Sequence, residues 1–170
     1  RRGEPAKALG LAGQALSVSM YDAEANYVYS VAARRLGRLV DAKETLGWAT
    51  RSPQFEAVAR VQQAEIALVE KDYPGAIDYA VKALIADDLN INALEVLAVA
   101  DRLTGQKSDA DRVLGWLLEV DPLDHLARFE KYLRSRDLKD LEACRALIRN
   151  ELPHETWLEM AAFYHRLGLD

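Results

Sequence analysis

Histidine and cysteine are the residue types in this chain best suited to metal binding or nucleophilic attack. The histidines are His125, His154 and His165, and no two of them have the i, i+4 spacing that places two ligands on one helical face. Cys144 is the single cysteine, so it has no cysteine partner for a zinc site or a disulfide. Apolar residues follow it three and four positions later, which favours a buried structural thiol over a nucleophile.

Two further patterns resemble reactive sites but lack the required spacing. The segment GQKSDAD at 105–111 contains a glycine and a lysine without the G-x-x-x-x-G-K-S/T spacing of a phosphate-binding loop. The adjacent carboxylates of Asp87 and Asp88 are typical of a solvated turn. We therefore expect no catalytic residue, no cofactor and no metal site, and a protein that is not an enzyme.

Composition and charge narrow the class of protein and of partner. The chain has 170 residues, 50% of them hydrophobic and 29% charged, which is the balance of one globular domain. Its net charge of −5 disfavours a nucleic-acid partner. No apolar run approaches the roughly 18–20 residues that cross a bilayer, so we expect no membrane insertion. A single cysteine fits a reducing compartment, and we expect a cytoplasmic location.

Small residues recur through the chain with a period of 34 residues, and such a period indicates stacked repeats. One series is Ala8, Ala42, Ala76 and Ala110. A second is Ser30, Ala64 and Ala98. Gly37 and Gly105 are two periods apart, with Lys71 midway between them. We expect the small side chains to lie where helices approach most closely, because a larger side chain would overpack there by about 1–3 kcal/mol.

Each period has the pattern of two helices. β-branched residues form no alternating runs of the kind that predict strands. Gly37 suits the end of a helix, where positive φ is needed, and Pro74 suits the first turn of one. The predicted helices span Ala23–Leu36, Val40–Arg51, Ala57–Glu70, Pro74–Ile85, Asn92–Leu103 and Ser108–Val120.

These motifs give the chain a resemblance to the tetratricopeptide repeat (TPR) family, whose 34-residue pattern is W-x2-L-G-x2-Y, A-x3-F and P. Trp157, Met160, Ala161 and Tyr164 match its first part. The segment Lys71–Asp88 resembles its second half, with Tyr73, Ala76, Ala83 and Leu84 in place. The fullest unit has Leu94, Leu97, Ala98, Gly105, Ala110, Leu114 and Pro122. The resemblance implies an all-α fold, a right-handed solenoid of stacked antiparallel helix pairs whose first helices line a concave groove.

The repeat count predicts one TPR-like domain over 1–170. It comprises the second helix of a partial repeat at 3–20, repeats at 23–56, 57–90 and 91–124, a divergent shorter repeat at 125–153, and the first helix of a partial repeat at 154–170. Since both ends fall inside a repeat, we expect the chain to be part of a longer protein. The alternative is that a second copy completes the exposed ends as a homo-oligomer.

The resemblance also assigns residues to the groove, where a partner would bind. They are Tyr27, Val31, Arg34, Val61, Glu65, Asn92, Glu95, Val99 and Arg102. Such a surface suits a peptide with apolar anchors and an acidic group, because arginine grips a carboxylate at two points. In the alternative interpretation, Arg34 and Arg102 only pair with groove carboxylates such as Glu65 and Glu95. Tyr27 is either a binding anchor or a packing residue.

The predicted function is a scaffold that binds a peptide segment or partner domain in the groove. One alternative is a structural, accessory or self-association array within a larger protein. The run DPLDHLARFE at 121–130 resembles arrays attached to carbohydrate-active bacterial proteins, so that larger protein could be such an enzyme. The family's lysine/asparagine clamp for chaperone tails falls on Tyr27 and Val31, so we predict no chaperone binding by that route. RNA binding would require a basic groove, and the net negative charge and the groove carboxylates disfavour it.

Overall fold

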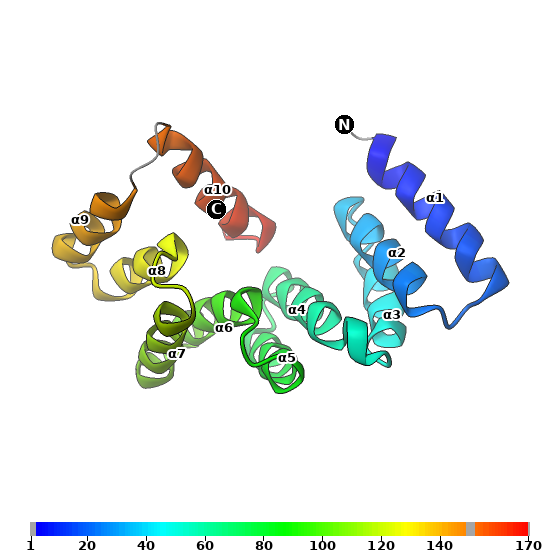
Figure 1. The fold of residues 1–170 in the computed structure, drawn as a ribbon, viewed down its shortest axis with the longest axis horizontal. Helices are drawn as coiled ribbons and strands as arrows, with labels where there is room; N and C mark the ends of the chain where they lie inside the picture. Colours follow the sequence, from blue (N-terminus) through cyan, green and yellow to red (C-terminus); the bar gives the residue numbers. More distant parts are fainter. Residues whose placement is uncertain (1–2, 149–151, 170) are drawn as a thin grey trace.

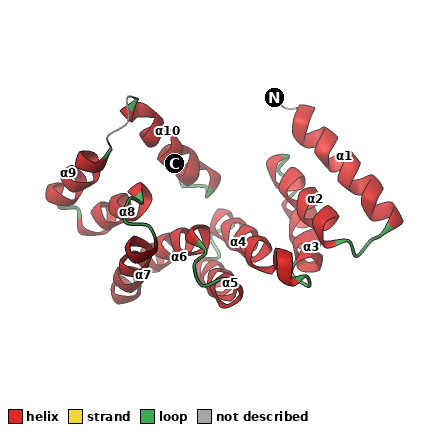
Figure 2. Ribbon diagram, in the orientation of Figure 1, coloured by secondary structure: helices red, strands yellow, loops and turns green. Residues whose placement is uncertain are grey.

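The structure is a computed structural model that describes residues 3–148 and 152–169. In these ranges the chain is all-helical and contains no strand, which confirms the predicted class (Figures 1 and 2). The helices are α1 (Gly3–Val18), α2 (Ala23–Arg35), α3 (Leu39–Ala49), α4 (Pro53–Val69), α5 (Tyr73–Ala86), α6 (Ile91–Thr104), α7 (Lys107–Val120), α8 (His125–Ser135), α9 (Leu138–Leu147) and α10 (Pro153–Arg166).

The predicted helices match the observed ones closely, with one exception. The prediction started a helix at Ala57, whereas α4 begins at Pro53. Proline fits the first turn of a helix because its missing N–H would be unpaired there, so Pro53 allows the earlier start. Successive helices form the antiparallel neighbours α2–α3, α4–α5, α6–α7 and α8–α9, while the division into repeats stays a prediction. The proposed boundaries at residues 1 and 170, and the stretch 149–151 of the divergent repeat, lie outside the described residues.

Side-chain caps and left-handed residues set the helix ends. The carboxylates of Asp22 and Asp124 accept hydrogen bonds from the amides three residues on, at 2.7 and 2.6 Å, and so start α2 and α8. At the carboxyl ends of helices, Gly37 after α2 and Gly105 after α6 both have φ of 76°. Lys71 lies midway between them in the period and adopts the same conformation with φ of 62°, so the turn recurs even where glycine does not.

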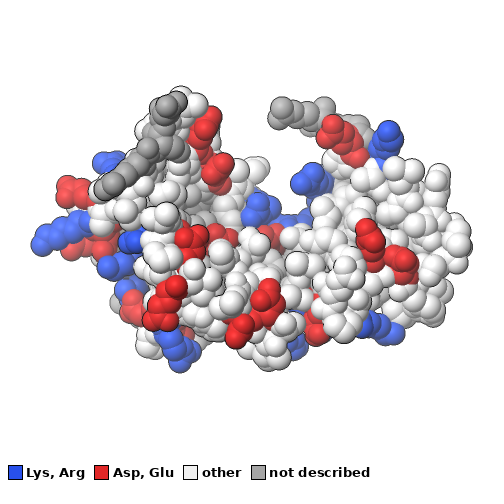
Figure 3. Space-filling view, in the orientation of Figure 1, with Lys and Arg blue, Asp and Glu red and all other residues white. Residues whose placement is uncertain are grey.

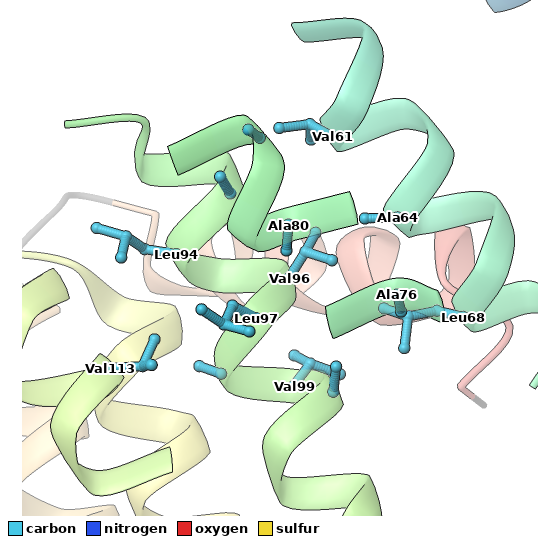
Figure 4. Close-up of a cluster of buried hydrophobic side chains, with 14 of the residues drawn as sticks. Val61, Ala64, Leu68, Ala76, Ala80, Leu94, Val96, Leu97, Val99 and Val113 are labelled. Atoms are coloured by element: carbon cyan, nitrogen blue, oxygen red, sulfur yellow. The ribbon is translucent and has the colours of Figure 1, made fainter. Parts of the chain in front are cut away.

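Three of the four alanines in the first series are buried between neighbouring helices, whereas Ala8 of α1 is half-buried. Ala42 and Ala76 have no exposed surface, and Ala110 is 1% exposed, as the packing argument predicts. Around them, α4 to α7 contribute the aliphatic side chains of a continuous core, including Leu68, Leu94 and others drawn in Figure 4. A second cluster joins α2, α3 and α4, with Ala59 and Ile66 contributed by α4. Each helix pair therefore buries its apolar surface against the next.

The helices α2 to α9 follow an arc, and α10 turns back into the hollow of that arc (Figure 1). The end of α10 reaches α4, because a Cβ on Gly168, just beyond that helix, would lie 3.6 Å from the Cα of Val69. Leu167 is fully buried in the same core cluster as Val61 and Ala64 of α4. Thus α10 contacts helices far from it in the sequence as well as α8, its near neighbour.

Candidate binding groove

The inner side of the arc contains a hollow bounded by α2, α4, the start of α6 and the end of α10. Its cavity volume is about 580 Å³. Its lining residues are Tyr27, Val31, Arg34, Arg35, Val58, Val61, Gln62, Glu65, Asn90, Asn92, His165 and Arg166. Six of the nine residues predicted for the groove therefore lie together here: Tyr27, Val31, Arg34, Val61, Glu65 and Asn92.

The other three predicted groove residues, all on α6, lie elsewhere. Glu95 lines a separate cavity of about 290 Å³ against α8 and α10, and Arg102 lines one of about 720 Å³ between α6, α8 and α10. Val99 is 0% exposed and belongs to the core, so its assignment to an accessible groove surface was wrong. The physical reason is that neighbouring helices cover α6 so fully that residues 96–101 are all buried.

Arg34 is held by contacts within the chain. One terminal nitrogen pairs with the Glu65 carboxylate and donates to the Gln62 side chain at 2.7 Å. The other donates to the backbone carbonyl of Arg166 at 3.2 Å. The Glu65 side chain is only 4% exposed and also lies 3.4 Å from the Arg166 guanidinium. This is the pairing that the alternative interpretation of Arg34 predicted, so Arg34 shapes the hollow and links α2, α4 and α10.

Arg102 is also paired, but not with the predicted glutamate. Its guanidinium donates to both carboxylate oxygens of Glu130 on α8, at 2.6 and 3.1 Å. The hydroxyl of Tyr164 on α10 donates to the same carboxylate at 2.7 Å. Burial and the neighbouring Glu130 carboxylate raise the pKa of Tyr164, which keeps its hydroxyl a donor. The predicted pairing with Glu95 was wrong because α8, the next helix on the inner side, supplies a closer carboxylate.

Tyr27 both packs and lines the hollow. Its ring centroid lies 5.6 Å from that of Phe55, which begins the inner face of α4. Burial, followed by the charge of Glu65, raises the pKa of the Tyr27 hydroxyl. The two predicted roles of Tyr27 are therefore compatible, since one face of the ring packs while the residue remains part of the lining.

The comparisons with known proteins identify the fold. No protein-family model matches the sequence, and no curated protein does. Among solved structures, the chain is similar to one titled "MamA RS-1 ArsTM double mutant", with 19% identity and a TM-score of 0.73. The match covers 88% of this chain and 88% of that one. The fold is a TPR-like helical solenoid.

The hollow of this TPR-like solenoid has an excess of positive charge. Arg34, Arg35 and Arg166 line it against the single carboxylate of Glu65, in a chain whose net charge is −5. Figure 3 shows basic side chains, in blue, in the space between α10 and the part of the molecule formed by α1 and α2. Arg35 is exposed and has no hydrogen bond or ion pair within the described residues. The hollow is therefore suited to an anionic group.

Sequence reasoning missed Arg35 and Arg166 as members of this set. Arg35 is next to the predicted Arg34 and could have been found by considering both basic residues in the last turn of α2. His165 and Arg166 reach the hollow only because α10 turns back toward α4. Their presence depends on the path of the chain between α9 and α10, which no local pattern predicts.

Three further features of the described residues concern metal binding, the cysteine thiol and helix length. No group of three histidine, cysteine, aspartate or glutamate residues is placed to hold a metal ion among residues 3–148 and 152–169. Cys144 is fully buried, with its Sγ 3.7 Å from the carbonyl oxygen of His125, and burial raises the pKa of its thiol. Over the same ranges, no helix is both long and apolar enough to cross a membrane.

Proposed function

We propose that this chain is a protein-interaction scaffold whose concave groove binds an acidic segment of a partner protein. The observation that carries the proposal is the arginine excess of the hollow, which contrasts with the acidic chain around it. A carboxylate offers arginine two parallel hydrogen bonds, and the partly enclosed site strengthens them relative to an open surface.

The lining residues divide into three roles under this proposal. Arg35, which lies on α2 and has no hydrogen bond or ion pair within the described residues, binds the partner's carboxylate. Val31 and Val58 contact its apolar side chains. Arg34 does not bind the partner directly, because its nitrogens already bond to protein atoms. It keeps the hollow in shape.

A peptide-library selection on the immobilised full chain tests this function. We expect the selected peptides to be enriched in aspartate and glutamate beside an apolar residue. Arg35→Glu reverses a charge in the hollow and should weaken the selected peptides at least tenfold. The matched control is Arg145→Glu, the same change at an exposed arginine of α9. Equal binding to both variants, or no enrichment of acidic residues, would contradict the proposal.

A second candidate is a structural or self-association role within a larger protein. It is favoured by exposed apolar side chains on and just after α1, where Leu11, Val18 and Met20 are all more than half exposed. Light scattering of the full chain and of Leu11→Glu separates the two functions. A wild-type oligomer that the substitution dissociates would support this second role, and a monomer in both samples would remove it.

A further inference from the structure

The helix α10 lies on the concave face with one apolar side toward it. Thr156, Met160, Phe163 and Leu167 are all buried, and their spacing of four, three and four residues places them on a single helical stripe. The exposed sides of α10 carry Glu155 and Glu159, together with Leu158, which is 64% exposed. This is the arrangement of an amphipathic helix seated in a groove.

The surface beneath α10 does not have the composition of an ordinary core. It includes carboxylates from three helices and a cap: Glu65 of α4, Glu95 of α6, Glu130 of α8 and Asp124 before α8. Acidic side chains are among the residues least often fully buried, and a core built only for stability avoids them. A face rich in charged groups is typical of a surface that binds a ligand and is solvated when the ligand leaves.

When α10 lies on the concave face it partly buries Glu95, and this burial disfavours the charged form of the carboxyl group. No hydrogen bond or ion pair of Glu95 occurs within the described residues. Burial, followed by the charge of Asp124, raises the pKa of this carboxyl to about 7, although Arg166 partly offsets the shift. Moving α10 away would return Glu95 to water, so this residue favours release of the helix.

The polar contacts of α10 are also of the kind a bound peptide makes. The backbone carbonyl of Arg166, at the carboxyl end of the helix, accepts from Arg34 at 3.2 Å. The Arg166 side chain lies 3.4 Å from Glu65, and the Tyr164 hydroxyl bonds to Glu130 at 2.7 Å. Each contact joins α10 to a helix of the inner face, namely α2, α4 or α8.

We propose that α10 is an internal ligand of the concave face, and that the natural partner carries an amphipathic helix with the same apolar spacing that displaces it. The proposal rests on the proposed function in one respect, that the concave face is the binding face. It adds the partner's secondary structure and the step that precedes binding. The acidic group of the partner then lies in the arginine-lined hollow, at the end of the groove where α10 now finishes.

A labelled peptide with the sequence of residues 153–169 tests the displacement. In the wild-type chain α10 occupies the face, so the peptide should bind weakly. Phe163→Ala in the full chain loosens α10 and raises the fraction of molecules with an open face, and the apparent affinity rises with that fraction. We expect at least tenfold tighter binding to this variant. Leu158→Ala, on the exposed side of α10, should leave the affinity at the wild-type value.

Two results would overturn the inference. One is a Phe163→Ala chain that keeps its helix content and thermal transition yet binds the peptide no tighter than the wild type. If that variant fails to fold, hydrogen exchange on the wild-type chain decides instead. Amides of α10 that exchange much faster than those of α4 to α6 support a separable helix, and equal protection shows an integral one.

The two proposals fail in different ways. Acidic peptides that bind through Arg35 while the α10 peptide never competes would leave the proposed function standing and remove this inference. Displacement of α10 without any preference for acidic peptides would support this inference and contradict the proposed function.

Discussion

Replacing Glu95 by glutamine is expected to stabilise the fold at neutral and alkaline pH but not at acidic pH. Glu95 lies on α6 beneath α10, near Asp124 and Arg166. Burial is the main cause that raises its pKa from 4.5 to about 7 in the folded chain. Glutamine has nearly the shape of the protonated side chain but never ionises, so the substitution isolates the contribution of the charge.

The magnitude follows from the shift of the pKa. A rise from 4.5 to about 7 means that the folded chain holds a proton that the unfolded chain releases. Folded stability is therefore complete below about pH 4.5 and falls as the pH rises through about 7. At 1.36 kcal/mol for each pKa unit, the full loss is about 3 kcal/mol. The glutamine variant should escape this loss.

Urea unfolding of both proteins at about pH 5 and about pH 8 measures the effect. The free energy of unfolding should differ little between them at the lower pH, and the variant should be more stable by up to about 3 kcal/mol at the higher pH. Other buried acids, such as Asp101 with its pKa raised to about 6, affect both proteins equally and cancel. Glu119→Gln, an exposed glutamate on α7, is the control. A difference that stays the same at both pH values would refute the reasoning.

Five further substitutions test the packing and the turns by urea unfolding. Glu130→Gln removes a carboxylate that is 1% exposed and accepts hydrogen bonds from Arg102 and Tyr164. The substitution should lower the free energy of unfolding by about 3 kcal/mol. A decrease below about 1 kcal/mol would mean that solvent replaces these contacts. Gly105→Ala should lower the free energy of unfolding by about 1–2 kcal/mol because the φ of Gly105 is 76°. Gly115→Ala, within α7 and facing open space, should raise it by about 0.5–1 kcal/mol. Equal effects of the two substitutions would contradict the conformational explanation. Ala76→Leu should cost about 1–3 kcal/mol by overpacking, whereas the exposed Ala86→Leu should change stability by less than about 0.5 kcal/mol.

The elements that the sequence predicts well are those set by local chemistry. The 34-residue series of small residues predicts which positions are buried, since contacts between successive helices demand small side chains at a fixed interval. Gly37 and Gly105 predict the turns, because a left-handed backbone favours glycine. Lys71 shows the limit of that rule, since the same turn forms there with a lysine and only the period indicates it.

The elements that the sequence predicts poorly depend on contacts between distant segments. The apolar spacing of residues 153–166 predicts a helix, but not that its end contacts α4. Once α10 is in place, Arg166 joins the hollow and Tyr164 joins the Arg102 pair. Of the proposed groove positions on α6, Asn92, Glu95 and Arg102 therefore line three separate cavities, and Val99 is buried in the core.

The charges of the inner face and the direction of α10 are connected. A helix carries partial negative charge at its carboxyl end, where its last carbonyls have no intrahelical partner. That end of α10 points at the arginines of the hollow, and Arg34 donates to one of these carbonyls. The negative end of α10 therefore pairs with only part of the positive charge of the hollow. Arg35 has no hydrogen bond or ion pair within the described chain. A partner helix that ends in an aspartate or glutamate would place a carboxylate beside Arg35, so under the displacement proposed above the same electrostatics that seat α10 favour a more acidic helix in its place.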